Sequence, residues 1–397
     1  MASLLLMKLV LASALLVSLA VAGCAGSDRN PRPEPPKISF LDGQTESGID
    51  QLVQQLQTQN HIAGIGVAIV QNGKVTLAKG YGLATVSGNV SVDANTTFEI
   101  GSCTKSFTTF ALMRIFDDPS LIKKPGITKL DLDQPASAYL VGSPNITMPA
   151  EWSGITVRQL LSMTSGIPDG SSNTQPWQTV VAAAAKKPLS FPPGTGYCYS
   201  NPGFMIIGEI IQQLTGTDYP TFMANQVFGP LGMTRTFIHL PTNTPANLAT
   251  GYQWNGTAWA VQSPRSPLSS FSSGAVITTA SDMATWLAAL AGQKVLSAAA
   301  YGQIWNPVLY PNGKSSQWGL GWNVEISTTP KYTIYRKDGG LPGFAAMMSI
   351  YAGDGVSVGL ITNESGAPVG AMAAQIVAKV KGLPSVPNPP GPTSDCN

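Results

Sequence analysis

Residues 98–116, FEIGSCTKSFTTFALMRIF, are the stretch from which both the fold and the chemistry of this chain can be inferred. Lys105 stands three residues after Ser102, at the start of a run with helical character. On a helix, residues i and i+3 lie on one face with their Cβ atoms about 5–6 Å apart, so Lys105 can reach the Ser102 hydroxyl. The positive potential of a helix N-terminus and burial both lower the pKa of a lysine. The spacing therefore predicts a serine whose proton a neutral lysine can accept.

Two shorter motifs later in the chain supply further polar groups. Tyr199 and Asn201 stand two residues apart, and in an extended segment such residues point to the same side. Lys337-Asp338-Gly339-Gly340 follows a strand-like run and offers a cation beside backbone that carries no side chain. Each pattern is weak alone, because the chain repeats all three elsewhere, in Ser120-x-x-Lys123, Tyr310-x-Asn312 and Lys124-x-Gly126. The inference depends on the order of the three motifs in the chain and on the segments that flank them.

Taken together, Ser102-x-x-Lys105, Tyr199-x-Asn201 and Lys337-x-Gly339 resemble the motifs of the penicillin-recognising serine hydrolases. The similarity is to the branch that holds class C β-lactamases, D-Ala-D-Ala carboxypeptidases and β-lactamase-like esterases. It spans about residues 47–382, and its flanking segments are 98–102, 155–161, 164–168, 228–233 and 339–344. The resemblance implies an α+β fold of the β-lactamase/transpeptidase type, in which helices flank an antiparallel sheet.

The same resemblance implies a covalent mechanism. Ser102 attacks a carbonyl and forms an acyl-enzyme, while Lys105 and Tyr199 serve as the acid-base pair. The backbone N–H groups of Ser102 and Gly340 form the oxyanion hole. No metal or organic cofactor is needed, because side chains and backbone supply both proton transfer and charge stabilisation.

The remaining motif residues are expected to bind substrate. Asn201 holds a substrate amide or the Lys105 amine, and Lys337, with Gly339 beside it, polarises the pocket. Related penicillin-recognising proteins commonly place Thr or Ser where this chain has Asp338. An aspartate there repels a substrate carboxylate or neutralises Lys337. We therefore expect ester or amide hydrolysis more than β-lactam hydrolysis or carboxypeptidase activity.

The expected partner is a small acyl substrate, either an ester, a D-amino peptide or a β-lactam. Esterase or amidase activity is the leading hypothesis, and D-Ala-D-Ala carboxypeptidase or β-lactamase activity is the alternative. A hypothesis from another class is a penicillin-binding sensor that is acylated once and does not turn over.

A different serine motif is excluded by its context. Gly355-x-Ser357-x-Gly359 matches the nucleophile-elbow pattern, which requires a strand–turn–helix context and a histidine later in the chain. Ser357 lies inside a strand-like run, and both histidines, His61 and His239, precede it. We expect Ser357 to be a strand residue and both histidines to be structural.

Periodicity places strands at both ends of the chain. Helical spacing covers residues 47–57, and strand-like runs at 65–70 and 75–78 flank Asn72-Gly73, a hairpin signal. Four further runs near the C-terminus, at 318–326, 332–336, 345–351 and 356–362, precede a helical stretch at 370–380. We expect one antiparallel sheet built from both termini, with a mostly helical lobe at about 118–270 inserted between its halves. The whole hydrolase domain is expected at 45–382.

The N-terminus resembles a bacterial lipoprotein signal. Residues 9–22 form an apolar run too short for a membrane span, and Val21-Ala22-Gly23-Cys24 resembles a lipobox. We expect a signal peptide at 1–23, lipidation of Cys24, a Pro-rich tether at 24–44 and a disordered tail at 383–397. The protein would then be exported and would be periplasmic or associated with the cell envelope, where its lipid holds it at a membrane. An ordinary secretory signal with an incidental cysteine is the alternative.

Composition excludes several function classes. The 397 residues carry 23 Lys+Arg against 21 Asp+Glu, a net charge of +2, and only 11% are charged. Such a balance gives no broad field for nucleic acid. Two histidines exclude a His-rich metal site, and the four cysteines show no zinc-like spacing. Because the resemblance brings Cys103 and Cys198 to one site and export permits oxidation, a disulfide between them is possible; two buried thiols are the alternative.

Overall fold

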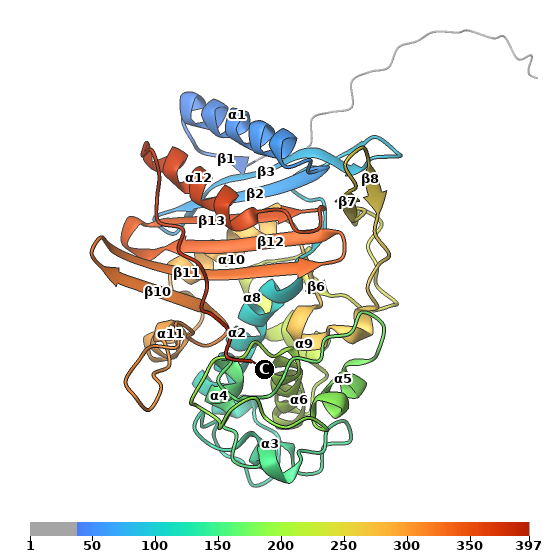
Figure 1. Ribbon diagram of the computed structural model, residues 1–397, viewed down its shortest axis with the longest axis vertical. Coiled ribbons are helices and arrows are strands. Elements are labelled where there is room, and N and C mark those ends of the chain that lie inside the picture. Colours follow the sequence, from blue (N-terminus) through green and yellow to red (C-terminus); the bar gives the residue numbers. More distant parts are fainter. Residues whose placement is uncertain (1–37, 397) are drawn as a thin grey trace, which may run out of the picture. The chain divides into compact units, whose positions relative to one another are not determined.

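Strands from the N-terminal and C-terminal parts of the chain form one antiparallel sheet in this computed structural model, which describes residues 38–396 (Figure 1). The strand order is β1-β3-β2-β13-β12-β11-β10, and β4 pairs with β3. The strands are β1 (Ile38–Ser39), β2 (Gly64–Gln71), β3 (Lys74–Thr85), β4 (Val90–Ser91), β10 (Asn323–Thr328), β11 (Lys331–Leu341), β12 (Phe344–Tyr351) and β13 (Val356–Thr362). The expected antiparallel sheet with flanking helices is confirmed.

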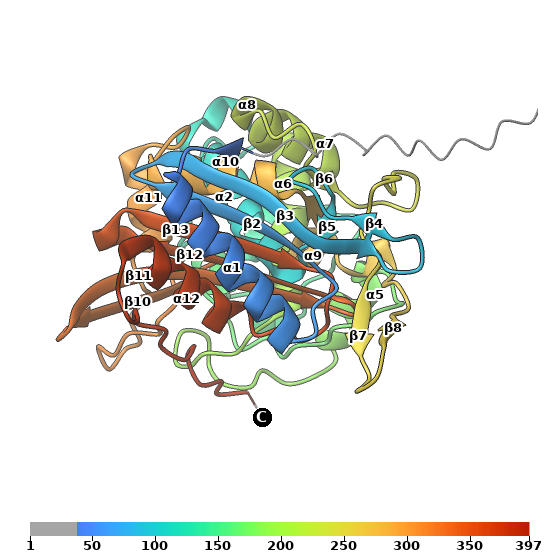
Figure 2. The same cartoon turned by 90° about the horizontal axis from the view of Figure 1, so that it is seen from above.

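Helices cover both faces of this sheet. On one face, α1 (Gly43–Gln59) and α12 (Val369–Lys381) pack side by side (Figure 2). Ile49, Val53 and Ile376 are fully buried there against sheet residues such as Leu360. On the other face lies α10 (Ala280–Ala291), which packs on β2, β3 and β13. Apolar burial on both faces explains why the central strands are almost continuously hydrophobic.

The remaining elements lie between the two halves of the sheet in sequence. They include helix α2 (Thr104–Asp117), which contacts α6 and α9 and so joins the helices of the 118–270 segment. Apart from short 3₁₀ and π turns, the others are α3 (Ala136–Leu140), α4 (Val157–Leu161), α5 (Trp177–Ala184), α6 (Asn201–Thr215), α7 (Tyr219–Met223), α8 (Gly229–Leu231), α9 (Phe271–Gly274), α11 (Ala298–Trp305), β5 (Phe98–Glu99), β6 (Phe237–Ile238), β7 (Tyr252–Trp254), β8 (Trp259–Val261) and β9 (Val276–Thr278).

Local residues fix several element ends. Asn72 and Gly73 both have positive φ, at 50° and 72°, as a tight turn between β2 and β3 requires. The first helix begins earlier than the expected residue 47, because the Asp42 carboxylate accepts the backbone N–H groups of Gln44 and Thr45. The expected tether is therefore too long at its end: residues 38–44 contain β1 and the start of α1.

The strand expected at 318–326 begins only at Asn323. Residues 319–322 form a turn in which the Gly319 N–H donates to the Trp322 carbonyl at 3.0 Å. Gly321 has φ of 76°, and a Cβ there would lie 2.2 Å from the Thr109 hydroxyl on α2. The backbone freedom and small size of glycine therefore allow a turn where hydrophobic periodicity predicts strand.

The tail expected to be disordered is ordered over its described part. The Tyr351 hydroxyl donates to the Pro387 carbonyl at 2.9 Å, and Arg336 donates to Asn388 Oδ1 at 2.9 Å. A disulfide joins Cys396 to Cys198. Proline-rich composition predicts the absence of helix and strand correctly, but these long-range bonds have no signal in the local sequence. The expected leader 1–23, Cys24 and tether residues 25–37 lie outside the described residues.

Candidate active site

Ser102 lies where the backbone leaves strand β5 and enters helix α2. A 3₁₀ turn at Gly101–Cys103 runs directly into α2, and Gly101 has φ of 49°. A Cβ at Gly101 would lie 2.8 Å from the Gly340 carbonyl oxygen on β11. The turn therefore places Ser102 at the N-terminus of a 14-residue helix and directly beside β11.

Lys105 has no exposed surface and three oxygen neighbours. Its Nζ lies 3.1 Å from Ser102 Oγ, 2.6 Å from Asn201 Oδ1 and 2.8 Å from the Ser273 carbonyl oxygen. Burial, and then the charge of nearby Lys337, lower the pKa of Lys105 well below its ordinary value. The lowered pKa favours the neutral amine, in the direction that the motif predicts.

Tyr199 contacts the same hydroxyl from the other side. Its OH lies 2.5 Å from Ser102 Oγ, and its ring packs 4.8 Å from Lys105 Nζ. Burial raises the pKa of Tyr199 to about 12, although Lys337 opposes this. The phenol is therefore protonated at neutral pH and donates to Ser102.

Hydrogen-bond capacity fixes the direction of proton flow. A neutral amine has two N–H donors and one lone pair. Asn201 Oδ1 and the Ser273 carbonyl are acceptors and take the two N–H groups, which leaves the lone pair of Lys105 for the Ser102 proton. A charged Lys105 amine donates to Ser102 Oγ, whereas the neutral amine accepts the Ser102 proton; in both states Ser102 accepts from Tyr199. The neutral form therefore raises the nucleophilicity of the serine oxygen.

Asn201 begins helix α6 and does not continue the extended segment. Ser200 caps that helix by accepting the Gly203 N–H, so Tyr199 remains extended while Asn201 enters the first turn. Both residues still reach the expected site. Of the two expected partners of Asn201, the structure places the Lys105 amine beside it.

Asp169 and Ser171 are site residues that the sequence analysis missed. Asn201 Nδ2 donates to Asp169 Oδ1 at 3.2 Å and to Ser171 Oγ at 2.5 Å. These contacts orient the amide so that its oxygen faces Lys105. The position of Asp169 in the sequence could have indicated its role, because it directly follows segment 164–168, which resembles a family segment.

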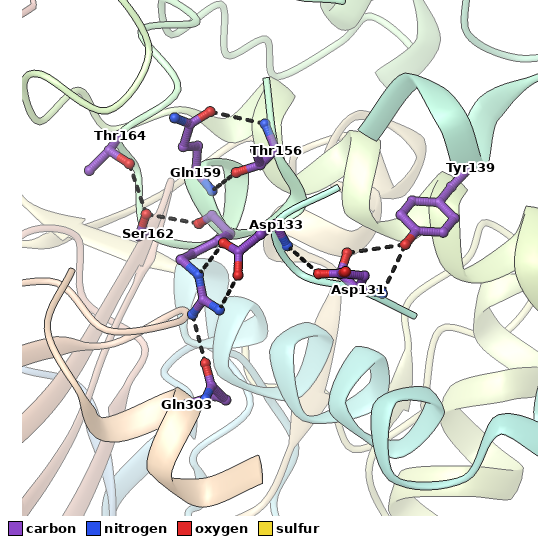
Figure 3. A network of polar contacts seen from close by, with 9 residues as sticks. Asp131, Asp133, Tyr139, Thr156, Gln159, Ser162, Thr164 and Gln303 are labelled. Atoms are coloured by element: carbon purple, nitrogen blue, oxygen red, sulfur yellow. Dashed lines mark hydrogen bonds and ion pairs between the residues drawn. The ribbon is translucent and has the colours of Figure 1, made fainter. Parts of the chain in front are cut away.

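A polar network surrounds α4, in the segment that precedes Asp169 in sequence (Figure 3). Thr156 and Gln159 form a capping box, and Ser162 and Thr164 share a hydrogen bond of 2.9 Å. Arg158 makes a two-pronged ion pair with Asp133 and donates to Gln303 at 2.8 Å. A capping box and a guanidinium thus fix the segment that leads into the loop that carries Asp169.

Lys337 is also buried, but it has an anionic partner. Its Nζ donates to the Asp338 carbonyl at 2.7 Å and to the Asp338 carboxylate at 3.1 Å. Burial, the largest influence, lowers the pKa of Lys337, but Asp338, Tyr199 and Cys103 together raise it, so the net pKa lies above the ordinary value. Lys337 in turn lowers the pKa of Asp338, whose side chain is 73% exposed. Arg336, the other cation on this stretch of β11, pairs with Glu325.

Gly339 allows β11 to approach the nucleophile. A Cβ at Gly339 would lie 2.0 Å from the Ile100 carbonyl oxygen, whereas a Cβ at Gly340 would meet nothing within 4 Å. Gly340 pairs with Ala345 of β12 and lies beside the Ser102 turn. The two expected oxyanion residues, Ser102 and Gly340, are therefore neighbours across this contact.

The prediction of a possible disulfide between Cys103 and Cys198 is wrong. Cys198 is bonded to Cys396, with the two Cα atoms 5.1 Å apart, and Cys103 is a free buried thiol. Cys103 Sγ faces the Lys337 carbonyl at 3.2 Å, on the β11 side of its turn. Burial raises the pKa of Cys103 to about 12, so this thiol is protonated and unreactive.

A cavity of about 340 Å³ adjoins Tyr199. Aromatic rings, the Asp338 carboxylate and two residues of the tail surround it. The lining residues are Tyr197, Tyr199, Trp318, Asn323, Arg336, Asp338, Met347, Gly391 and Pro392. A substrate group in this cavity would lie beside Tyr199 and would contact aromatic rings as well as the polar side chains of Asn323, Arg336 and Asp338.

The alternative motif residues lie elsewhere. Ser357 is buried in β13, and the Lys123 amine donates to the Ser120 carbonyl instead of approaching its hydroxyl. His239 bonds Glu99 and Thr244 at 2.9 Å each, and His61 stacks on Trp254. Within residues 38–396, no group of three His, Cys, Asp or Glu side chains is arranged to hold a metal, and no helix is long and apolar enough to cross a membrane.

Comparison with known proteins agrees with this geometry. A family model described as Beta-lactamase matches residues 49–381. The chain therefore belongs to the β-lactamase family, whose fold is shared by serine hydrolases.

Among curated proteins, the chain is similar to Protein flp of Staphylococcus aureus (strain N315), at 29% identity over 256 residues, which is 62% of this chain and 49% of that protein. It is also 29% identical over 331 residues to Unguisins hydrolase ungD' of Aspergillus campestris (strain IBT 28561), covering 78% of this chain and 60% of that one. The chain thus spans about half to three-fifths of the length of these relatives.

Solved structures share the fold. The octameric penicillin-binding protein homologue from Pyrococcus abyssi superposes with a TM-score of 0.71 at 21% identity, over 85% of this chain and 78% of that chain. A class C β-lactamase superposes with a TM-score of 0.67 at 23% identity, over 84% and 96%. The expected family and its fold are confirmed.

Proposed function

We propose that the protein is an exported serine hydrolase that forms an acyl-enzyme on Ser102 and acts on small, uncharged esters or amides. The observation that carries the proposal is the position of the Ser102 hydroxyl between a buried Lys105, whose pKa is lowered, and a protonated Tyr199. That arrangement can both remove the serine proton and deliver one to a leaving group.

Acylation follows from these contacts. The Ser102 proton moves to Lys105 Nζ as Oγ attacks the substrate carbonyl carbon. The backbone N–H groups of Ser102 and Gly340 stabilise the oxyanion that forms. Collapse breaks the bond to the leaving group, which receives a proton from Tyr199, and the proton held by Lys105 restores the phenol. The products are the acylated serine and a neutral alcohol or amine, and water then releases the acid.

The preference for an uncharged acyl group rests on Lys337. Its side chain has no exposed surface, and its charge is already paired with the exposed Asp338 carboxylate. A substrate carboxylate at this position would meet Asp338 before Lys337 and would be repelled. Aromatic residues of the adjoining cavity favour an apolar or aromatic group. One relative is named a hydrolase, and this agrees with catalytic turnover of a substrate.

Export and lipid anchoring belong to the same proposal. Support comes from the apolar run at 9–22 and the lipobox-like Val21-Ala22-Gly23-Cys24. The Cys198–Cys396 disulfide adds to this, because such bonds persist in oxidising compartments. Radiolabelled palmitate should be incorporated by bacterial cells into the wild-type chain and not into Cys24→Ser. Equal labelling of both would reject the anchor.

The proposed nucleophile is tested by covalent labelling. A fluorophosphonate should add one equivalent to the peptide that contains Ser102, as read by mass spectrometry. Ser102→Ala should abolish this labelling. Ser357→Ala and Ser120→Ala are matched controls, since both serines sit in competing motifs, and they should label like wild type. Labelling that survives Ser102→Ala would reject the mechanism.

Substrate class is tested on the same preparation. A p-nitrophenyl ester, a chromogenic cephalosporin and a D-Ala-D-Ala peptide should be compared as kcat/KM. We expect the ester to be turned over with the highest value. Turnover of the peptide or the cephalosporin above the ester would instead favour carboxypeptidase or β-lactamase activity. Stoichiometric labelling by penicillin with no turnover of any substrate would favour the sensor.

A further inference from the structure

The described C-terminal residues 383–396, called the C-terminal strap below, run from α12 toward the active site (Figure 1). The strap has no helix or strand of its own, yet it is bonded along its length to the sheet. The Tyr351 hydroxyl on β12 donates to the Pro387 carbonyl at 2.9 Å. Arg336 on β11 donates to Asn388 Oδ1 at 2.9 Å and also to the Pro389 carbonyl. The strap thus crosses the sheet at strands that also carry the site.

The end of the strap is fixed to the segment that precedes Tyr199. The Asp395 N–H donates to the Tyr197 carbonyl at 2.7 Å, and the Tyr197 N–H donates to the Asp395 carboxylate at 2.8 Å. One residue further along each segment, the Cys198–Cys396 disulfide joins them covalently. Cys198 is immediately before Tyr199, whose OH contacts Ser102. Strap position and site geometry are therefore linked through two adjacent residues.

Between its two attachments the strap lines the cavity beside Tyr199. Gly391 and Pro392 face this space of about 340 Å³, which Tyr199, Trp318 and Met347 also line. A Cβ added at Gly391 would meet nothing within 4 Å, and its φ lies outside the left-handed region. This part of the wall therefore has room for a side chain but carries none.

We propose that the C-terminal strap is the specificity-determining wall of the substrate cavity, and that the Cys198–Cys396 disulfide holds it closed. This inference rests on the proposed function, because the cavity must receive part of the acyl substrate. A segment without secondary structure keeps its position only through side-chain and backbone bonds to other elements. The disulfide spans a sequence separation of 198 residues and restrains the strap where local structure does not. Its loss lets the wall move outward and admits larger substrates.

Two variants of the full chain test this in opposite directions. Cys396→Ser removes the covalent attachment without altering the neighbour of Tyr199. Gly391→Trp adds bulk to the wall at a position where the backbone accepts a side chain. The measurement is the second-order rate constant for labelling Ser102 with two fluorophosphonates, one with a small alkyl group and one with a long alkyl chain. We expect the ratio of long-chain to small-probe labelling to rise at least about fivefold in Cys396→Ser and to fall at least about fivefold in Gly391→Trp.

Matched controls and folding checks make each outcome decisive. Gly353→Trp adds the same side chain in the turn after β12, where a Cβ also meets nothing, and should leave the ratio at the wild-type value. Circular dichroism should show the native spectrum and a cooperative melt for each variant used, with a lower Tm for Cys396→Ser because it lacks the disulfide. If wild-type Ser102 is not labelled by either probe, the proposed function fails and this inference fails with it. If labelling is normal and neither variant changes the ratio, only the strap proposal is overturned.

Discussion

Lys105 at the start of α2 and Lys337 in β11 make an instructive comparison. Neither has appreciable exposed surface, and both amines lie near the ring of Tyr199, at 4.8 and 5.6 Å from its centroid. The partners of Lys105 are a serine hydroxyl, an amide oxygen and a carbonyl oxygen, all uncharged. Lys337 has a carboxylate at 3.1 Å. The pKa of Lys105 is lowered, and that of Lys337 is raised.

The comparison teaches that burial does not by itself decide the charge of a lysine. Burial is the largest influence on both pKa values and lowers them, but at Lys337 the charge and hydrogen bond of Asp338, together with Tyr199 and Cys103, outweigh it, whereas no anion makes direct contact with Lys105. The charged Lys337 then lowers the pKa of Lys105 further. One lysine is thereby kept as a cation and helps to keep the other neutral, which is the division of roles that acid-base catalysis requires.

Replacing each lysine by methionine should give the largest contrast between the two regions. Lys105→Met removes the proton acceptor while keeping side-chain length, so kcat/KM for a p-nitrophenyl ester should fall by about 10²–10⁴-fold. Lys337→Met removes a charge that is already paired, and the fall should be at most about tenfold. Steady-state kinetics on variants with native circular dichroism checks this. Equal losses in the two variants would contradict the assigned roles.

Substitution of the two glycines of β11, Gly339 and Gly340, should give the next largest difference in kcat/KM. Gly339→Ala places a Cβ 2.0 Å from the Ile100 carbonyl, so β11 must move away from the Ser102 turn and take the Gly340 N–H with it. We expect kcat/KM to fall by about 10²-fold, the usual effect of losing an oxyanion donor.

Gly340→Ala is the matched control, because its Cβ would meet nothing within 4 Å. The loss of kcat/KM should stay within a few-fold. A larger loss in Gly340→Ala than in Gly339→Ala would contradict the view that β11 must approach the turn closely.

Sequence reasoning predicted the parts of the site that depend on local spacing. The i, i+3 relation brought Lys105 to Ser102, and the antiparallel sheet followed from strand-like runs at both ends. It failed where long-range contact decides. Asp169 orients Asn201 from a loop 32 residues away in sequence, and Cys198 pairs with Cys396 because the strap returns to the site. Neither relation leaves a periodic or compositional trace.

Asp338 is the residue that makes Lys337 differ from an anion-binding lysine, so its replacement should change substrate preference. Asp338→Thr removes the competing carboxylate and frees Lys337 to attract a substrate carboxylate. The ratio of the penicillin acylation rate constant to kcat/KM for a neutral ester should rise about tenfold.

Asp354→Thr provides the control, since Asp354 also pairs with a lysine, Lys381, in a turn after β12. That variant should keep the wild-type ratio. An unchanged ratio in a well-folded Asp338→Thr would remove the electrostatic argument for uncharged substrates.

The smallest expected effect is a displacement of the acidic limb of the pH profile. Lys105 must be neutral to accept the Ser102 proton, so kcat/KM is lost as the pH falls through the pKa of Lys105, which lies well below the ordinary lysine value. Because Lys337 lowers that pKa and Asp338 raises it, Lys337→Met removes the lowering charge and leaves the raising one. The acidic limb should therefore move to higher pH.

Asp169→Asn should move the same limb in the opposite direction. Asp169 raises the pKa of Lys105, so its neutral replacement lowers that pKa and extends activity to lower pH. If Tyr199 must be protonated, the basic limb reports its pKa of about 12, which is set first by burial, lowered by Lys337 and raised by Asp169. The basic limb should therefore move to higher pH in Lys337→Met and to lower pH in Asp169→Asn. Profiles of kcat/KM for one neutral ester, measured on wild type and both variants at constant ionic strength, provide the test. Movement of the acidic limb in the same direction in both variants would show that the limb does not report Lys105, and the division of roles between the two buried lysines would have to be abandoned.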